Sequence, residues 1–132
     1  MITPDKVFSV LRMKGSSLPT QIKKALGEGD TFIVGAVLTE LTRGGKVKVS
    51  NVKRGGSPFY YAPEHRSRLA EFIDDLGEKD RRTARLLQEK QLLRDDRQDP
   101  LVRVSLRQIK DFAVPVEVRK GDENVLFWKW FT

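Results

Sequence analysis

The sequence predicts an α+β protein in which helices precede a β-hairpin, and two observations in residues 1–64 lead to this prediction. Apolar residues recur every three or four positions in three successive segments up to about residue 43, which is the period of amphipathic helices. From residue 46 apolar residues alternate with lysines, which is the period of a half-buried strand. A third observation extends the prediction, because a similar order of patterns returns in the second half of the chain.

Each of the first three predicted helices has a recognisable start or end. Thr3-Pro4-Asp5 is a typical helix start, and Gly15 is suited to end the first helix. Pro19 opens a second helix that runs to Leu26. Asp30 or Thr31 caps a third helix that runs to about Arg43. We expect the apolar stripe of the third helix to face the core: Phe32, Val34, Val37, Leu38 and Leu41.

A β-hairpin is predicted directly after the third helix. The alternating segment 46–52 is its first strand, and 58–62 is its second strand. The turn at 53–57 contains Gly55-Gly56, which can adopt positive φ angles.

The second half of the chain repeats this order less clearly. We expect helices at 69–76 and 79–90, a polar loop at 95–98, and a third helix from Pro100 to Phe112 or Ala113. A second hairpin follows over 114–131, with one of its two aromatic faces in the core. The adjacent acids at 74–75 and 95–96 are expected to be solvated. Two domains are therefore expected, 1–64 and 65–132.

The segment LPTQIKKALGEGDTFIVGAVLTELTRGGKVKVSNVKRGGSPFYYAPE resembles the winged helix-turn-helix regulators. That family often carries an I-x-x-x-L-G phrase in its second helix, and its third helix ends in an L-x-x-L-x-x-x-G-x-V phrase. The matching residues are Ile22, Leu26, Gly27, Leu38, Leu41, Gly45 and Val47. The Gly-Gly-Ser-Pro wing followed by aromatic residues looks like that of archaeal winged-helix proteins. The IKDFAVPVEV and FWKWF segments are similar to a poorly characterised archaeal group.

The resemblance implies three helices plus a β-hairpin wing in 1–64, and it specifies a fold better than a function. For 65–132 two predictions stay open. One is a helical domain with a β-hairpin, and the other is a second, degenerate winged-helix-like unit.

The charge distribution favours a polyanionic partner for the first half. The chain has a formal net charge of +7. Residues 1–64 contain ten Lys or Arg against five Asp or Glu, whereas 65–132 contain fifteen against thirteen. No acidic residue occurs between Glu40 and Glu64. A local excess of cations of this kind is typical of nucleic-acid-binding surfaces, although solvated surfaces also carry such an excess.

A winged helix lays its third helix in the major groove and its wing on the flanking backbone. Lysine and arginine on these elements would contact phosphates, whereas few residues of the third helix are suited to read bases. We therefore expect salt-sensitive binding with modest sequence preference. The candidate nucleic-acid-binding residues are Lys23, Lys24, Thr31, Thr39, Arg43, Lys46, Lys48, Lys53 and Arg54.

Two functions are compatible with these features. The first is a double-stranded-DNA-binding transcriptional regulator or chromatin-associated factor, for which dimerisation through the helix beginning near Glu78 is an expectation. The second is a docking module in a protein or ribonucleoprotein assembly, such as a ribosome, polymerase or repair complex. The scarcity of base-reading residues on the third helix motivates this alternative.

Several kinds of chemistry have no support in the sequence. Without cysteine the chain cannot form disulfides, zinc fingers or thiol nucleophiles. The one histidine, His65, is expected to be an exposed surface residue, and no phosphate-binding G-x-x-x-x-G-K-S/T segment occurs. We therefore expect no enzyme activity, no cofactor and no metal site. The sequence also lacks a signal-peptide pattern and an apolar span, which predicts a cytoplasmic protein without a membrane partner.

Overall fold

The computed structural model describes all 132 residues, and the chain divides into two compact units, Met1–Leu69 and Ala70–Thr132. Each unit combines helices with one small antiparallel sheet, so the fold class is α+β. The 3-10 segment η1 (Pro63–Asp75) spans the division between the units. The domain boundary predicted after residue 64 falls near the start of that segment.

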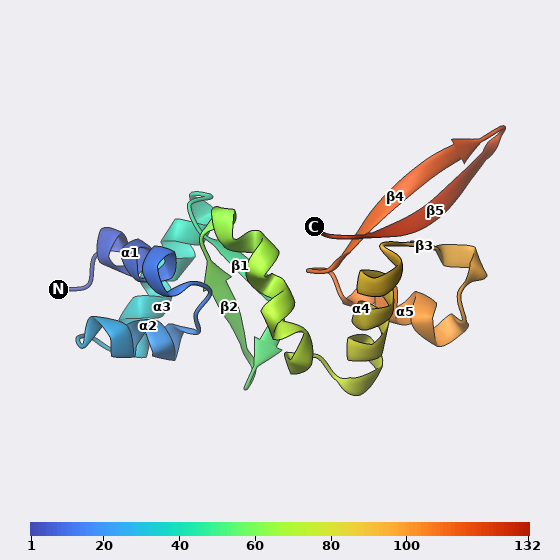
Figure 1. Cartoon of the computed structure of the whole chain (residues 1–132). Coiled ribbons are helices and arrows are strands. Elements are labelled where there is room, and N and C mark those ends of the chain that lie inside the picture. Colours follow the sequence, from blue (N-terminus) through green and yellow to red (C-terminus); the bar gives the residue numbers. More distant parts are fainter. The chain divides into compact units, whose positions relative to one another are not determined.

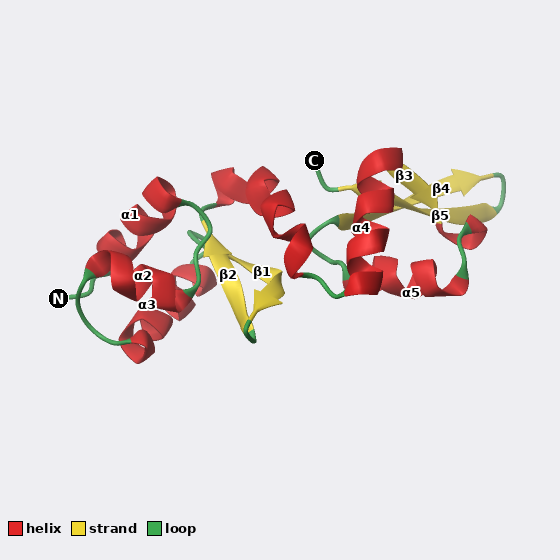
Figure 2. Cartoon of the chain, turned by 60° about the horizontal axis from the view of Figure 1, so that its bottom comes forward, coloured by secondary structure: helices red, strands yellow, loops and turns green.

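Unit 1 consists of three helices followed by a hairpin that lies at one edge of the helices (Figures 1 and 2). An isolated bridge joins Ser17, between the first two helices, to Tyr60 in the hairpin, with backbone N–H···O distances of 2.9 Å in both directions. This order is compatible with a winged-helix-like arrangement. The elements are α1 (Pro4–Lys14), α2 (Pro19–Leu26), α3 (Thr31–Arg43), β1 (Lys48–Arg54) and β2 (Ser57–Tyr61).

Side-chain caps fix the starts of the helices in unit 1. Thr3 Oγ1 accepts from the Lys6 amide at 3.2 Å, and Asp30 Oδ1 accepts from the Ile33 amide at 2.9 Å. Both bonds satisfy amide groups that a helix start otherwise leaves unpaired. The predicted cap at Thr3 is thereby confirmed, and Asp30 rather than Thr31 caps α3.

The core of unit 1 is built from one face of each helix and from the residue that leads into β1. The predicted stripe of α3 is confirmed at Val34, Leu38 and Leu41, but it is wrong at Phe32, which is 82% exposed. At about 100° per residue, Phe32 lies almost opposite Val34 on the helix. The buried core residues are Val7, Leu11, Ile22, Val34, Leu38, Leu41 and Val47.

An irregularity in β1 changes which of its residues face the core. Between the pairs Val49↔Tyr60 and Lys53↔Pro58, the three residues 50–52 lie opposite Phe59 alone. Strict alternation predicts burial of Val49, but Val49 is 42% exposed, whereas Ser50 and Val52 are buried. The extra residues shift the phase of the pleat, as bulges do.

Unit 2 contains two helices and a three-stranded sheet with the strand order β3-β5-β4. The β4–β5 ribbon packs on the helices at its base, where Trp128 and Trp130 lie, and its tip extends beyond them (Figure 1). Trp128 and Trp130 are buried, which confirms that one aromatic face of this hairpin belongs to the core. The elements are α4 (Glu78–Lys90), β3 (Leu92–Arg94), the 3-10 turn η2 (Asp95–Arg97), α5 (Pro100–Gln108), β4 (Ala113–Lys120) and β5 (Glu123–Trp130).

Three predictions for the second half are wrong. Residues 69–76 lie mainly in the 3-10 segment η1 instead of an α-helix, although Leu69 and Ile73 are buried. The segment 95–98 begins with the turn η2, whose Asp95 is buried rather than solvated. The third helix ends at Gln108, because Ala113 is paired with Trp130 in the sheet and requires extended backbone there.

Unit 2 nevertheless repeats the order of unit 1 in part. A helix, a short strand, a second helix and a hairpin follow one another, and the strand before the second helix pairs with the last strand. In unit 1 the helix α2 lies between Ser17, which forms the isolated bridge, and α3. In unit 2 the turn η2 takes the corresponding position, between β3 and α5.

Candidate nucleic-acid interface

All nine candidate residues are exposed, and they fall into three groups along unit 1. The first group lies around the end of α2 and the start of α3, the second on the later turns of α3, and the third on the hairpin and the residues before it. The groups are Lys23, Lys24 and Thr31; Thr39 and Arg43; and Lys46, Lys48, Lys53 and Arg54.

The first group surrounds one surface hollow. Lys23, Lys24 and Thr31 line it together with Gly27 and Glu28. Glu28 forms ion pairs with the amino group of Met1 and with the Lys6 ammonium, and the pKa of its carboxyl is lowered, chiefly by a hydrogen bond from the N-terminal amino group. The acid in this hollow therefore already has cationic partners, and Lys23 and Lys24 add further positive charge to the same surface.

The second group connects α3 with the hairpin. Thr39 and Arg43 line a hollow together with Val49 of β1 and Tyr60 of β2. The later turns of α3 and the base of the hairpin therefore form one continuous surface.

Both polar side chains of the second group have partners within α3 itself. The Thr39 hydroxyl donates to the Gly35 carbonyl oxygen at 2.9 Å. Arg43 Nη1 donates to Glu40 Oε1 at 2.8 Å. Arg43 is the one cation that α3 contributes, and its guanidinium lies against an acid of the same helix in an exposed ion pair.

The side chain of Ser50 holds the irregular part of β1 in place. Its Oγ accepts from the Phe59 amide at 2.9 Å and donates to the Val52 carbonyl oxygen at 2.6 Å. Ser50 thus takes the place of a backbone partner that the bulge removes. Lys48 and Lys53 lie on either side of the bulge, and both are exposed. In a regular strand, residues five positions apart point to opposite faces, so the bulge is what allows both lysines to be exposed.

At the tip of the hairpin, Gly55 and Gly56 have φ angles of 58° and 80°. Two successive left-handed residues are the requirement of the tight turn that best matches the twist of a hairpin, and glycine meets it without steric cost. Arg54, next to this turn, places its guanidinium 5.1 Å from the centre of the Phe59 ring. This contact orients Arg54 along the hairpin.

The excess of positive over negative charge in the chain belongs entirely to unit 1. Residues 1–69 contain twelve Lys or Arg against five Asp or Glu, and residues 70–132 contain thirteen of each. The net charge of +7 therefore coincides with unit 1, and unit 2 is neutral. The two units differ more in net charge than the two segments predicted from the sequence, 1–64 and 65–132, because Arg66 and Arg68 belong to unit 1.

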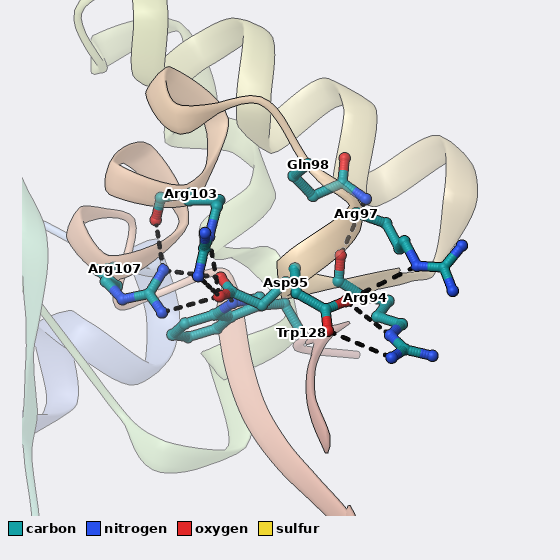
Figure 3. A network of polar contacts seen from close by, with 8 residues as sticks. Arg94, Asp95, Arg97, Gln98, Arg103, Arg107 and Trp128 are labelled. Atoms are coloured by element: carbon teal, nitrogen blue, oxygen red, sulfur yellow. Dashed lines mark hydrogen bonds and ion pairs between the residues drawn. The ribbon is translucent and has the colours of Figure 1, made fainter. Parts of the chain in front are cut away.

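The most heavily bonded polar group of the chain lies in unit 2 and was not expected from the sequence. The Asp95 carboxylate accepts hydrogen bonds from Arg107 at 2.7 and 3.0 Å, from Arg103 at 2.9 and 3.1 Å, and from Trp128 Nε1 at 2.9 Å (Figure 3). We call Asp95, Arg103, Arg107 and Trp128 the Asp95 cluster. Arg107 also lies 5.5 Å from the centre of the Trp128 ring.

The Asp95 cluster fits a structural role better than a catalytic one. Its hydrogen bonds, above all those from Arg107, hold the pKa of the Asp95 carboxyl well below its usual range, although burial opposes this shift. A carboxylate that is ionised and already accepts five hydrogen bonds is a poor proton acceptor. The sequence contains one sign of the cluster, because Arg103 and Arg107 are spaced by four on a helix that starts five residues after Asp95.

No group of three or more His, Cys, Asp or Glu is placed to hold a metal ion. His65 is partly buried rather than exposed, and its Nδ1 atom is shielded from solvent without a hydrogen-bond partner. None of the helices has both the length and the apolar character that crossing a bilayer requires.

Comparison with known proteins gives no match for this chain: no family model, no curated protein and no solved structure is significantly similar to it. The resemblance to winged helix-turn-helix regulators therefore depends on the motifs in the sequence and on the order of elements.

Proposed function

We propose that the chain is a nucleic-acid-binding protein of the winged-helix type, and that unit 1 binds double-stranded DNA through α3 and the β1–β2 hairpin. The observation that carries this proposal is the charge division: unit 1 holds the whole net charge of +7, and its acid-free stretch between Glu40 and Glu64 contains the hairpin. Cations gathered on one element attract the phosphate backbone without regard to sequence.

The order of elements supports the choice of α3 and the hairpin. In a winged helix the third helix enters the major groove and the wing lies on the adjacent backbone. The hollow lined by Thr39, Arg43, Val49 and Tyr60 makes α3 and the hairpin neighbours on one surface. Unit 2 follows a related order with η2 in place of a helix, which supports a degenerate winged-helix-like unit there.

The proposed role is that of a transcriptional regulator or chromatin-associated factor with modest sequence preference. The Arg43–Glu40 ion pair supports the modest preference, because α3 then presents no unpaired guanidinium for guanine. The role is one of binding rather than catalysis. The neutral charge of unit 2 indicates that it does not share the duplex-binding role.

The test is the salt dependence of duplex binding in the double variant Lys48→Ala/Lys53→Ala. Each phosphate contact contributes about 0.9 to the slope of log K against log salt concentration. The variant should therefore bind more weakly at low salt, with a slope smaller by roughly 2. We leave Arg54 in place because it contacts the Phe59 ring and its loss would also affect folding.

The matched control is Arg119→Ala/Lys120→Ala, which removes the same charge from the exposed end of β4 in unit 2. This control should bind duplex as the unaltered protein does. Equal slopes for the Lys48/Lys53 variant and the unaltered protein would remove the hairpin from the interface. Equal loss in both variants would mean that only total charge matters.

A second candidate function is docking within a protein or ribonucleoprotein assembly. It is favoured by two apolar side chains on α5, Leu101 and Val104, which are 65% and 54% exposed and lie one turn apart. Exposed apolar pairs of this kind often mark protein contacts. Purification from cell extract with and without nuclease separates the functions. A complex that survives nuclease but is lost in Leu101→Ser/Val104→Ser would support docking.

A further inference from the structure

The outward face of α3 is apolar at its centre. Phe32, Ala36 and Thr39 are spaced by four and three residues, so they share one side of the helix. All three are exposed, and Phe32 is 82% exposed. Val34, Leu38 and Leu41, on the opposite side, are buried in the core of unit 1. This face is therefore turned away from the protein and has no partner within the chain.

The polar atoms near this face are already bonded. The proton of the Thr39 hydroxyl is donated to the Gly35 carbonyl, so Thr39 offers an outside partner its methyl group and the acceptor lone pairs of its oxygen, but no donor. Arg43 and Glu40 pair with each other at 2.8 Å. The centre of α3 therefore offers a phenyl ring, two methyl groups and few hydrogen-bonding atoms.

Cations line the hollows at the two ends of this apolar centre. Lys23, Lys24 and Thr31 line the hollow at its N-terminal end, and Thr39 and Arg43 line the hollow that it shares with the hairpin. The hairpin adds Lys48 and Lys53. A partner that fits must therefore carry negative charge at its edges and apolar groups between them.

Duplex DNA has this chemistry where thymine is present, because the thymine C5-methyl group lies in the major groove between two rows of phosphates. Alanine, the threonine methyl group and phenylalanine are the side chains suited to contact that methyl group. An RNA duplex fits less well, since it has uracil and a major groove too deep and narrow for side chains to read.

We propose that α3 recognises thymine methyl groups through Phe32, Ala36 and Thr39, so that the protein prefers A·T-rich DNA without reading it by hydrogen bonds. This inference rests on the proposed function of unit 1 and adds the class of sequence that it selects. The flanking lysines supply affinity and the apolar centre of α3 supplies the preference.

The experiment compares alternating poly(dA-dT) with alternating poly(dA-dU), which differ only in the thymine methyl group. The full chain should bind the poly(dA-dU) duplex about threefold to fivefold more weakly for each methyl group contacted. The variant Phe32→Ala/Thr39→Ser keeps only the Ala36 methyl group of the three contacts, so the difference in its affinity for the two duplexes should shrink by at least threefold, while the salt dependence of its binding stays unchanged. Because both altered side chains are exposed, the variant should fold as the unaltered protein does.

The matched control is Met13→Ala, which removes an 84% exposed apolar side chain from α1. It should retain the preference for poly(dA-dT). Equal affinity of the unaltered protein for both duplexes would overturn the inference and leave duplex binding intact. Failure to bind either duplex would contradict the proposed function itself. A dimer in solution that Phe32→Ala/Thr39→Ser converts to monomer would assign this face to self-association and would also overturn the inference.

Discussion

At the scale of single residues, two buried polar side chains, Ser50 and Asp95, make hydrogen bonds in places where regular backbone pairing is interrupted. Ser50 supplies the partner that the bulge in β1 takes from the Phe59 amide, and Asp95 joins the turn η2 to α5 and β5. Both are buried, and buried polar groups stabilise a fold only when their hydrogen bonds are satisfied. Each residue should therefore be sensitive to a substitution that changes few atoms.

The substitution Asp95→Asn should lower the free energy of unfolding of unit 2 by about 2 kcal/mol, because the two guanidiniums lose their counter-charge and the Asn amide nitrogen cannot accept their hydrogen bonds. Urea unfolding followed by tryptophan fluorescence measures this, since both tryptophans of the chain, Trp128 and Trp130, lie in unit 2. Asp96→Asn is the control: Asp96 is exposed, and its loss should cost less than about 0.5 kcal/mol.

The Asp95 cluster also predicts a pH dependence. Its carboxyl has a lower pKa in the folded protein than in the unfolded chain, where the value is about 3.9. The folded unit therefore binds fewer protons, and the stabilisation is fully present above about pH 5 and is lost as the pH falls below about 4. The urea midpoint of unit 2 should fall over this range. A parallel fall of the same size in Asp95→Asn would contradict the assignment.

The substitution Ser50→Ala should remove two buried hydrogen bonds, the one that Ser50 Oγ accepts from the Phe59 amide and the one that it donates to the Val52 carbonyl oxygen, at a cost of about 2 kcal/mol. Hydrogen exchange of residues 48–61, followed by mass spectrometry, should become faster there than in the helices. Ser57→Ala, in the same hairpin, is the control and should leave exchange nearly unchanged. If Ser50→Ala also preserves the slow exchange, the bulge does not depend on the serine hydroxyl.

At the scale of elements, the sequence predicted where helices start better than it predicted whether a segment forms an α-helix or a 3-10 helix. Local chemistry places the starts of α1 and α3, since Thr3 and Asp30 bond amides only three residues away. The type of η1 and the end of α5 were not predicted, because apolar spacing identifies buried positions such as Leu69 and Ile73 but not the hydrogen-bond pattern between them.

One helix end carries strain that a substitution should relieve. Gln91 follows α4 with a φ of 69°, and it is the one residue other than glycine with positive φ. Such a conformation costs about 1 kcal/mol or more for a residue with a Cβ atom. Gln91→Gly should therefore raise the free energy of unfolding of unit 2 by about 0.5 kcal/mol, after the greater flexibility of the unfolded chain is subtracted.

The urea midpoint measured by tryptophan fluorescence tests this prediction. Lys90→Gly, one residue earlier and still within α4, should instead destabilise by about 1 kcal/mol. Destabilisation by both substitutions would show that the Gln91 side-chain bond to the Gln88 carbonyl outweighs the backbone strain.

At the scale of the whole molecule, charge and exposed apolar surface divide between the units. Unit 1 carries the net charge of +7, and unit 2 is neutral with its own exposed apolar pair on α5. If the charged unit alone binds duplex, ligand binding should stabilise that unit and not the other, because a ligand stabilises only the state that binds it.

We expect saturating duplex to slow hydrogen exchange strongly in residues 31–61 and to leave residues 78–130 unchanged. At a duplex concentration 100 times the dissociation constant, the stabilisation should be about 2.7 kcal/mol. Exchange measured with and without duplex, at one salt concentration, gives both values. Equal protection in the two ranges would mean that unit 2 takes part in binding or that the units open together.

The sequence by itself determined the helices of unit 1, both hairpins and the concentration of cations before residue 64, because each depends on residues within a few positions of one another. The tertiary structure alone decided that the phase of β1 shifts at Ser50 and that Asp95 is buried. The physical reason is that burial depends on the partners a residue meets: Asp95 meets Trp128, 33 positions away, and no local pattern encodes that contact.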